Sequence, residues 1–256
     1  MLTQDHLKIA LTRFPRLYRL ARRPYALARF LAREPHEPEY AVFGLFPDRD
    51  GLFLDVGANA GMSALSFRIY KRKNPILSIE PNPYHSKDLK FAGRLVGSFS
   101  YLSVAAGDQP GVLTLHVPVY RGVPLTTEAS LDLDAVLDSP SLRARLGNRM
   151  DGQDFAVVEK TVPVKRIDDM DLKPDFVKLD VQGFEYAVLL GMLQTLRTAR
   201  PILLIETPTE ATYDLLAEEG YQPRAYDVAT RRLTKELDSA GNVVFLPNDV
   251  AKRGET

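Results

Sequence analysis

The stretch LFLDVGANAGMSALSFRIY, residues 52–70, joins a short apolar run to a segment with helical spacing. Asp55 ends the apolar run, and Gly57 and Gly61 flank Asn59 before the helical positions begin. Glycines at these positions let the backbone turn tightly and approach a ligand, and a helix that starts there presents free N–H groups. The stretch therefore predicts a strand, a loop and a helix built to lie against a small polar cofactor.

Short, continuously apolar runs recur along the chain, at residues 51–56, 75–80, 100–105, 175–180, 201–206 and 242–247. Runs of this kind are typical of strands buried on both faces of a parallel sheet. Helical stretches separate them, so the sequence predicts an α/β fold with right-handed crossovers.

The pattern differs after the third run and at the N-terminus. Residues 111–119 alternate like an exposed strand, residues 131–146 have helical spacing, and residues 155–164 resemble a strand again. We expect an insertion at about 118–160 that covers the substrate, although a flap without a ligand is an equal alternative. The domain boundaries follow: a helical appendage at 1–48 and the main domain at 49–256.

Composition excludes several classes of protein. The 256 residues carry 33 Lys and Arg against 33 Asp and Glu, so no overall charge favours nucleic acid as a partner. The absence of cysteine excludes disulfides, thiolate metal sites and thiol nucleophiles. No apolar run has the length of a signal peptide or a membrane span, so we expect a cytoplasmic protein.

The N-terminal segment is basic. Within it, residues 1–34 contain only the acids Asp5 and Glu34 against the cations Lys8, Arg13, Arg16, Arg19, Arg22, Arg23, Arg29 and Arg33. A basic amphipathic segment can contact an anionic membrane, here through residues 1–40, or an anionic substrate. The alternative is an ordinary solvated face of a packed helix.

Four of the six apolar runs end on a carboxylate: Asp55, Glu80, Asp180 and Glu206. Ligands of an open parallel sheet bind outside the carboxyl ends of its strands, so we expect these side chains to converge on one cleft. A phosphate loop of the G-x-x-x-x-G-K-[S/T] type is absent, and Asn59 stands where a dinucleotide fingerprint needs glycine. S-adenosylmethionine, which has no phosphate, fits, with Glu80 placed to bind the ribose hydroxyls.

The order of four motifs resembles that of FkbM-type S-adenosylmethionine-dependent methyltransferases: FLDVGANAG, SIEPNP (78–83), VAAGDQPG (104–111) and VKLDVQGFEYAVLLGM (177–192). The resemblance covers about residues 50–210. It implies a class I, Rossmann-like fold with helices on both faces of a mostly parallel, seven-stranded sheet. It also implies a cofactor site in which Asp55, Gly57, Asn59 and Gly61 hold the methionine, Glu80 the ribose, and Ala106 with Asp108 the adenine; helix capping is the alternative for Asp55 and Glu80.

The segment KLDVQGFE supplies further candidates. Lys178 and Asp180 share one face of a strand, and Glu185 opens the next helix, where it is either catalytic or a stabiliser of the helix dipole. Asp180 and Glu206 are the expected general base for a hydroxyl acceptor, or ligands of a Mg²⁺ ion that would lower the acceptor's pKa. His85 and His116 are weaker candidates for the base.

The resulting expectation is an O-methyltransferase that acts on a sugar, a glycan or a secondary metabolite. An NAD-dependent oxidoreductase is one alternative, disfavoured by Asn59 and by the absence of a Y-x-x-x-K pair. A non-catalytic binding module on the same fold is another, and an enzyme that acts on lipid-linked glycans at a membrane is a third.

Overall fold

The computed structural model describes residues 15–48, 50–237 and 241–253. Its main sheet has eight strands in the order β11-β10-β12-β9-β8-β1-β2-β3. The five strands from β9 to β3 run parallel, while β12, β10 and β11 are each antiparallel to their neighbours. The bounds are β1 Leu52–Val56, β2 Ile76–Ile79, β3 Phe99–Leu102, β8 Pro174–Leu179, β9 Ile202–Glu206, β10 Tyr221–Asp227, β11 Arg232–Thr234 and β12 Asn242–Pro247.

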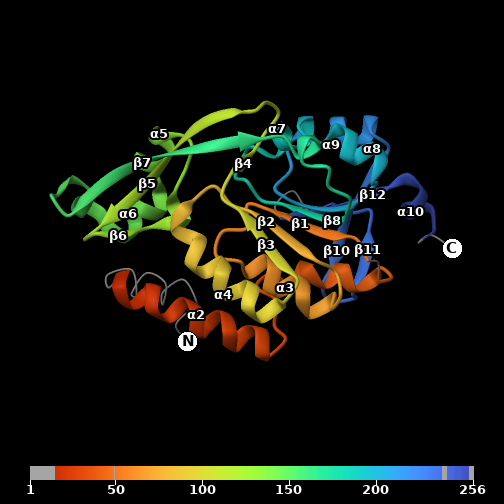
Figure 1. Ribbon diagram of the computed structural model, residues 1–256, viewed down its shortest axis with the longest axis horizontal. Coiled ribbons are helices and arrows are strands. Elements are labelled where there is room, and N and C mark those ends of the chain that lie inside the picture. The colour runs from red at the N-terminus through yellow and green to blue at the C-terminus, as the bar shows by residue number, and fades with distance from the viewer. Residues whose placement is uncertain (1–14, 49, 238–240, 254–256) are drawn as a thin grey trace.

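Helices cover both faces of this sheet (Figure 1). One face packs against α2 (Pro15–Leu31), the 3₁₀ helix η1 (Pro38–Leu45), α3 (Met62–Tyr70), α4 (Ser86–Val96) and α10 (Asn248–Arg253). The other packs against the short helix η5 (Ile167–Met170) and against α7 (Glu185–Leu190), α8 (Leu193–Thr198) and α9 (Glu210–Glu218). Helices are therefore present on both faces of the sheet, as the sequence predicts.

The central strands are apolar throughout because each residue is buried on one face or the other. In β1, Phe53 belongs to the core under α3, whereas Leu54 belongs to the core under α7. Phe176 and Val177 of β8 divide in the same way. Alternation of side chains with a period of two therefore produces two cores from continuous apolar runs.

The core on the α3 face is built around aromatic rings. Phe53 of β1 stacks on Phe67 of α3, with centroids 3.8 Å apart and planes 4° from parallel. Phe43 of η1 and Phe176 of β8 pack edge-on at 5.5 Å. All four rings are fully buried, so this cluster fixes η1 and α3 on the sheet.

A second sheet, ordered β4-β7-β5-β6, forms between β3 and β8. It consists of β4 Ala105–Ala106, β5 Gly111–Tyr120, β6 Val123–Pro124 and β7 Phe155–Lys165. Between β6 and β7 lie η3 (Thr126–Glu128), α5 (Leu133–Leu137), α6 (Pro140–Leu146) and η4 (Gly147–Asp151), and they extend to one end of the molecule (Figure 1). The insertion expected at about 118–160 lies within residues 105–165, which form this second sheet and its helices.

The structure confirms the α/β, class I architecture, but the expected number of seven strands is wrong. The main sheet has eight, because β10 and the edge strand β11 complete it. The sequence of β10, YQPRAYD, contains Pro223 and Arg224, which are untypical of a buried strand. Among the helices that the structure describes, none combines the length and the apolar character needed to cross a membrane.

Candidate active site

The carboxyl ends of β1, β2, β8 and β9 bring the four acids of the sequence pattern together. Asp55 follows Phe53 by two residues, and Asp180 follows Phe176 by four, so both side chains leave the sheet on the face covered by η1 and α3. Each of the two contributes to the electrostatic environment of Glu80, and Asp180 also contacts Glu206. The cleft therefore forms on one side of the sheet, at its carboxyl end.

Asp180 is a partly exposed acid that is held in place by a buried lysine. Its Oδ2 accepts a hydrogen bond of 2.9 Å from Nζ of Lys178, a side chain only 1% exposed, while the Asp180 side chain is 24% exposed. A hydrogen bond with Asp180, together with burial, raises the pKa of Glu206 to about 8. At neutral pH, Glu206 is thus protonated and donates to Asp180, so the Asp180 carboxylate is held by two donors.

A second layer of polar groups lies behind this pair. Burial raises the pKa of Glu37, but contacts with His36 and the charge of Lys178 outweigh it and lower the pKa to about 2. His36 Nε2 lies 3.2 Å from Glu37 Oε1, and Nδ2 of Asn242 donates to Glu37 Oε2 at 3.1 Å. Glu37 therefore remains a carboxylate at neutral pH.

Asp55 lies beneath the loop rather than on the surface of a cavity. It is fully buried, and its Oδ2 accepts hydrogen bonds from Ser63 at 2.7 Å and from Ser78 at 2.8 Å. Burial raises its pKa, and its Oδ1 has no hydrogen-bond partner within the described part of the chain. The observed role of Asp55 is to join β1 to β2 and to the first turn of α3.

The two glycines of the loop closely approach other parts of the protein, whereas the sequence suggested an approach to a ligand. A Cβ on Gly57, whose φ is +82°, would lie 1.7 Å from the carbonyl oxygen of Asp180. A Cβ on Gly61, at φ +81°, would lie 2.7 Å from Cβ of Ala92 in α4. These glycines are thus required by the packing of β1 against β8 and of the loop against α4.

Glu80 fixes the conformation of the loops around it. Its Oε2 accepts from the backbone N–H of Asn59 at 2.7 Å, and its Oε1 from that of Asn82 at 2.8 Å. Asn59 has a positive φ of 47°, a conformation that asparagine tolerates better than most residues. Burial raises the pKa of Glu80 to about 7 in spite of these hydrogen bonds.

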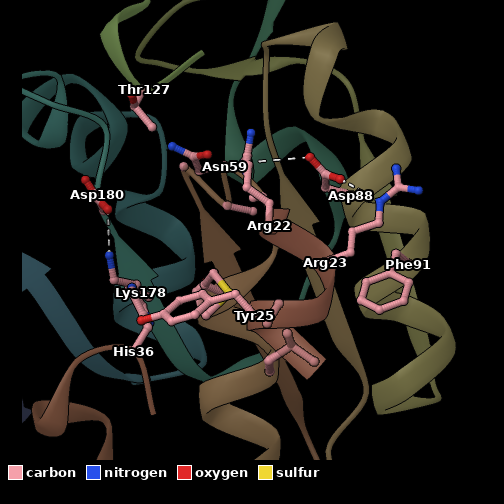
Figure 2. A pocket seen from close by; sticks show the side chains of 17 residues that line it. Arg22, Arg23, Tyr25, His36, Asn59, Asp88, Phe91, Thr127, Lys178 and Asp180 are labelled. Atoms are coloured by element: carbon pink, nitrogen blue, oxygen red, sulfur yellow. Dashed lines mark hydrogen bonds and ion pairs between the residues drawn. The ribbon is translucent and has the colours of Figure 1, made fainter. Parts of the chain in front are cut away.

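Two cavities meet at these loops. The larger, of about 300 Å³, lies between α2, the start of α3, α4 and the end of β8 (Figure 2). The smaller, of about 130 Å³, lies between β2, β4, β5, η3 and the loop after β8, and Glu80, Ala106 and Leu115 are among its lining residues. Gly57, Asn59 and Asp180 line both, so the two cavities share a wall at Asp180.

Two other candidates lie outside both cavities. Glu185 is buried, and its carboxylate accepts from the backbone N–H of Val181 at 3.0 Å and from that of Gly183 at 3.0 Å. It stabilises the loop after β8, a structural role that differs from the expected effect on the helix dipole. Asp108 is exposed and does not line either cavity.

The histidine candidates receive little support as general bases. His85 lines the smaller cavity, but burial and the charge of Arg22 lower its pKa to about 4, which makes it a weak base. His116 lies in β5, with Nδ1 3.9 Å from Glu159, and lines neither cavity.

The site provides two carboxylates for a Mg²⁺ ion but, in the part of the chain that the structure describes, no larger group of ligands around them. Within the described ranges, no group of three or more His, Asp or Glu side chains is arranged to hold a metal ion. The ammonium of Lys178 lies 2.9 Å from Asp180 Oδ2, and its positive charge disfavours a cation at this carboxylate. The expected Mg²⁺ site is therefore unsupported.

The sequence allowed the basic segment before β1 to contact a substrate, but it did not predict which of its residues line the site. Arg22, Arg23 and Tyr25 of α2, and His36 after it, line the larger cavity (Figure 2). The only signals were the excess of arginine and the rarity of histidine, and neither predicts where a side chain will lie.

The described arginines of this segment bind groups of the same chain. Arg23 contacts Asp88 of α4, Arg29 donates to Pro35 O, and Arg33 donates to Ile69 O. Lys8 and Arg13, and the side chains of Arg16 and Arg19, lie outside the described part. Membrane contact through residues 1–40 stays a prediction.

Comparison with known proteins identifies this arrangement. The sequence profile described as Methyltransferase FkbM domain matches residues 55–233, well over half of the chain. Among curated proteins, no significant match was found.

Several solved structures resemble the fold. The methyltransferase FkbM from Methylobacillus flagellatus superimposes with a TM-score of 0.50 at 18% identity, over 82% of this chain and 50% of that one. This chain thus spans half the length of that relative. Precorrin-6y C5,15-methyltransferase from Geobacter metallireducens gives a TM-score of 0.44 at 9% identity, over 81% and 84% of the two chains. Fibrillarin from Aeropyrum pernix, with natively bound S-adenosyl-L-methionine, gives 0.41 at 12% identity, over 82% and 76%.

Proposed function

This chain belongs to the FkbM family of S-adenosylmethionine-dependent methyltransferases, and from that premise we propose that it methylates a hydroxyl group of a sugar, a glycan or a secondary metabolite. The observation that carries the proposal is the position of Asp180 on the wall shared by both cavities. A carboxylate there can meet a cofactor from one side and an acceptor from the other. Family membership also sets aside the NAD-dependent oxidoreductase.

The residues around the smaller cavity suit the nucleoside part of the cofactor. The Glu80 carboxylate at its edge can accept hydrogen bonds from two ribose hydroxyls, because each carboxylate oxygen has a second lone pair. Ala106 and Leu115 offer apolar surface for a base. Asp108 lies outside this cavity, so its expected contact with adenine lacks support.

The residues between the cavities suit the methionine part. The first N–H groups of α3 have no partner within the helix and attract a carboxylate, and Met62 and Ser63 of this turn line the larger cavity. Gly57 and Asn59 line both cavities and lie between the two proposed subsites.

Proton removal is the task left to the protein. S-adenosylmethionine, when bound, supplies an electrophilic methyl group. The acceptor hydroxyl must be aligned and lose its proton, and Asp180 is the group placed to accept that proton. The ammonium of Lys178 fixes the Asp180 carboxylate in position, and protonated Glu206 donates to it from the side of β9.

The test separates binding from catalysis. Isothermal titration calorimetry with S-adenosylhomocysteine should give micromolar affinity for both the unchanged protein and Asp180→Asn. Transfer of a tritiated methyl group to hydroxylated glycans and polyketides should fall about 10²-fold or more in Asp180→Asn, the range for loss of a general base. Asp108→Asn is the matched control, because that aspartate is exposed and outside both cavities.

Each result has a distinct meaning. Full turnover by Asp180→Asn would exclude this residue as the base. Failure of the well-folded protein to bind S-adenosylhomocysteine would contradict the assigned cofactor site. Binding without transfer to any acceptor would favour the non-catalytic binding module.

A further inference from the structure

The outer wall of the larger cavity is basic, and it comes from a part of the chain that precedes the matched FkbM domain. Arg22 and Arg23 of α2 reach the cavity on either side of Asp88 (Figure 2). The family match begins at residue 55, so these two arginines lie outside the matched region.

The charges of this wall do not cancel. Arg23 Nε donates to Asp88 Oδ1 at 2.9 Å, and Arg22 Nη2 lies 3.7 Å from Asp88 Oδ2. Among the lining residues the other acid is Asp180, which is paired with Lys178. Two guanidinium groups thus share one carboxylate, which leaves an excess of one positive charge at the cavity wall.

Arg23 retains the donors that would bind an anion. Its side chain is 42% exposed, and its Nη1 and Nη2 groups make no hydrogen bond within the described residues. Four N–H bonds in one plane match the two oxygens of a carboxylate or a phosphate. Arg22 is more constrained, because its Nη1 donates to Thr126 of η3 at 3.3 Å and its side chain is 18% exposed.

The shape of the wall favours a ligand with a ring. Phe91 of α4 lies beneath the Arg23 guanidinium, 5.9 Å from its carbon, and Tyr25 of α2 is exposed at the same cavity. Aromatic side chains offer flat apolar surface beside these cationic donors. The cofactor's own carboxylate has another site, the first turn of α3, so the basic wall remains for the second substrate.

We infer that Arg22 and Arg23 bind a carboxylate or phosphate group of the acceptor, so that the methylated hydroxyl belongs to an anionic compound such as an acidic or phosphorylated sugar. This inference rests on the proposed function, because it requires the methionine part of the cofactor to lie at the first turn of α3 and to leave the α2 side of the larger cavity to the acceptor. The anion would bind at α2, and its hydroxyl would extend toward Asp180, which lines the same cavity.

The experiment titrates three hexoses of similar size into the protein saturated with S-adenosylhomocysteine, at low ionic strength: glucuronate, glucose 6-phosphate and neutral glucose. We expect at least one anionic hexose to bind about tenfold or more tightly than glucose, and the stronger of the two shows whether the natural group is a carboxylate or a phosphate. Arg23→Gln should weaken the binding of that probe at least about fivefold, since it removes a charge-assisted contact. Arg94→Gln, an exposed residue of α4 outside both cavities, makes the same change of charge and should have no effect.

Other outcomes overturn the inference. It fails if glucose binds as well as both anionic hexoses, if neither anionic hexose binds at millimolar concentration, or if Arg23→Gln binds the anions unchanged. A loss of affinity for S-adenosylhomocysteine in Arg23→Gln would assign the guanidinium to the cofactor, and the proposed methyltransferase activity would stand. If the unchanged protein does not bind S-adenosylhomocysteine at all, the proposed function fails with the inference.

Discussion

Replacement of Glu206 by glutamine should remove a pH-dependent part of the stability. In the folded protein the pKa of Glu206 is raised from 4.5 to about 8, first by its hydrogen bond with Asp180 and then by burial. Between these two pH values the folded protein keeps a proton that the unfolded chain has released. The contribution of Glu206 to the free energy of unfolding is therefore largest below about pH 4.5 and is lost as the pH rises through about 8.

The magnitude follows from the same two values. A difference between 4.5 and about 8 corresponds to about 5 kcal/mol at 1.36 kcal/mol per pH unit. Because Glu206 is only partly buried, solvent screening reduces this figure, and we expect a loss of about 2 kcal/mol. A glutamine amide can still donate to Asp180 and does not titrate, so the variant should lack this loss.

Urea unfolding at pH 5, 6, 7, 8 and 9 measures the effect. Glu206→Gln and the unchanged protein should have similar stability at pH 5, and the variant should be about 2 kcal/mol more stable at pH 9. Glu80 has a raised pKa in both proteins, so its contribution cancels in the difference. Glu218→Gln, at an exposed position of α9, is the control and should follow the unchanged protein. A difference between Glu206→Gln and the unchanged protein that does not vary with pH would refute the shared proton.

Four further predictions concern the loop, the cofactor, the core and the metal hypothesis. Gly57→Ala should destabilise by more than the roughly 1–3 kcal/mol of ordinary overpacking, because its Cβ would lie 1.7 Å from the carbonyl oxygen of Asp180, and an unchanged urea midpoint would contradict this. Glu80→Ala should weaken S-adenosylhomocysteine binding by about 1–3 kcal/mol in calorimetry, and equal affinity would show that the ribose binds elsewhere. Phe67→Ala should cost about 3–5 kcal/mol of unfolding free energy, since it removes the ring stacked on Phe53, and a smaller loss would mean that the core closes around the gap. Addition of EDTA should leave S-adenosylhomocysteine affinity unchanged; a decrease would restore the metal hypothesis.

Much of the main sheet could be predicted because its central strands obey a simple rule. A strand buried on both faces must be apolar throughout, and a polar residue becomes tolerable only where the strand ends. That rule places Asp55 at the end of β1 and Asp180 immediately after β8, and the structure has them there. It also predicts that Lys178 and Asp180 share a face, which their hydrogen bond of 2.9 Å confirms.

The remainder of the site depends on contacts between distant segments. Arg22 and Glu37 belong to a segment whose charges also suit a solvated helix, and only packing on α4 and β12 shows where they lie. Glu185 turns back to the N–H groups of its own loop, a choice that side-chain spacing does not reveal. The sequence predicted strands at 111–119 and 155–164 but not that they pair with each other. The pairing of β5 with β7 spans more than thirty intervening residues, and side-chain patterns do not reveal such a distant partner.

The two-sided burial of the central strands has a consequence for how this protein can change during evolution. Deletion of one residue before Phe176 in β8 would exchange Phe176 with Val177 between the two cores, and deletion of Leu179 would turn Asp180 away from Lys178. A change of two residues would preserve the faces, although it would shorten the strand. The acids of the site therefore keep their face of the sheet only if the number of residues from Phe53 to the loop after β1, and from Phe176 to the loop after β8, changes by an even number. Substitutions should accumulate along these strands far more readily than insertions or deletions of a single residue.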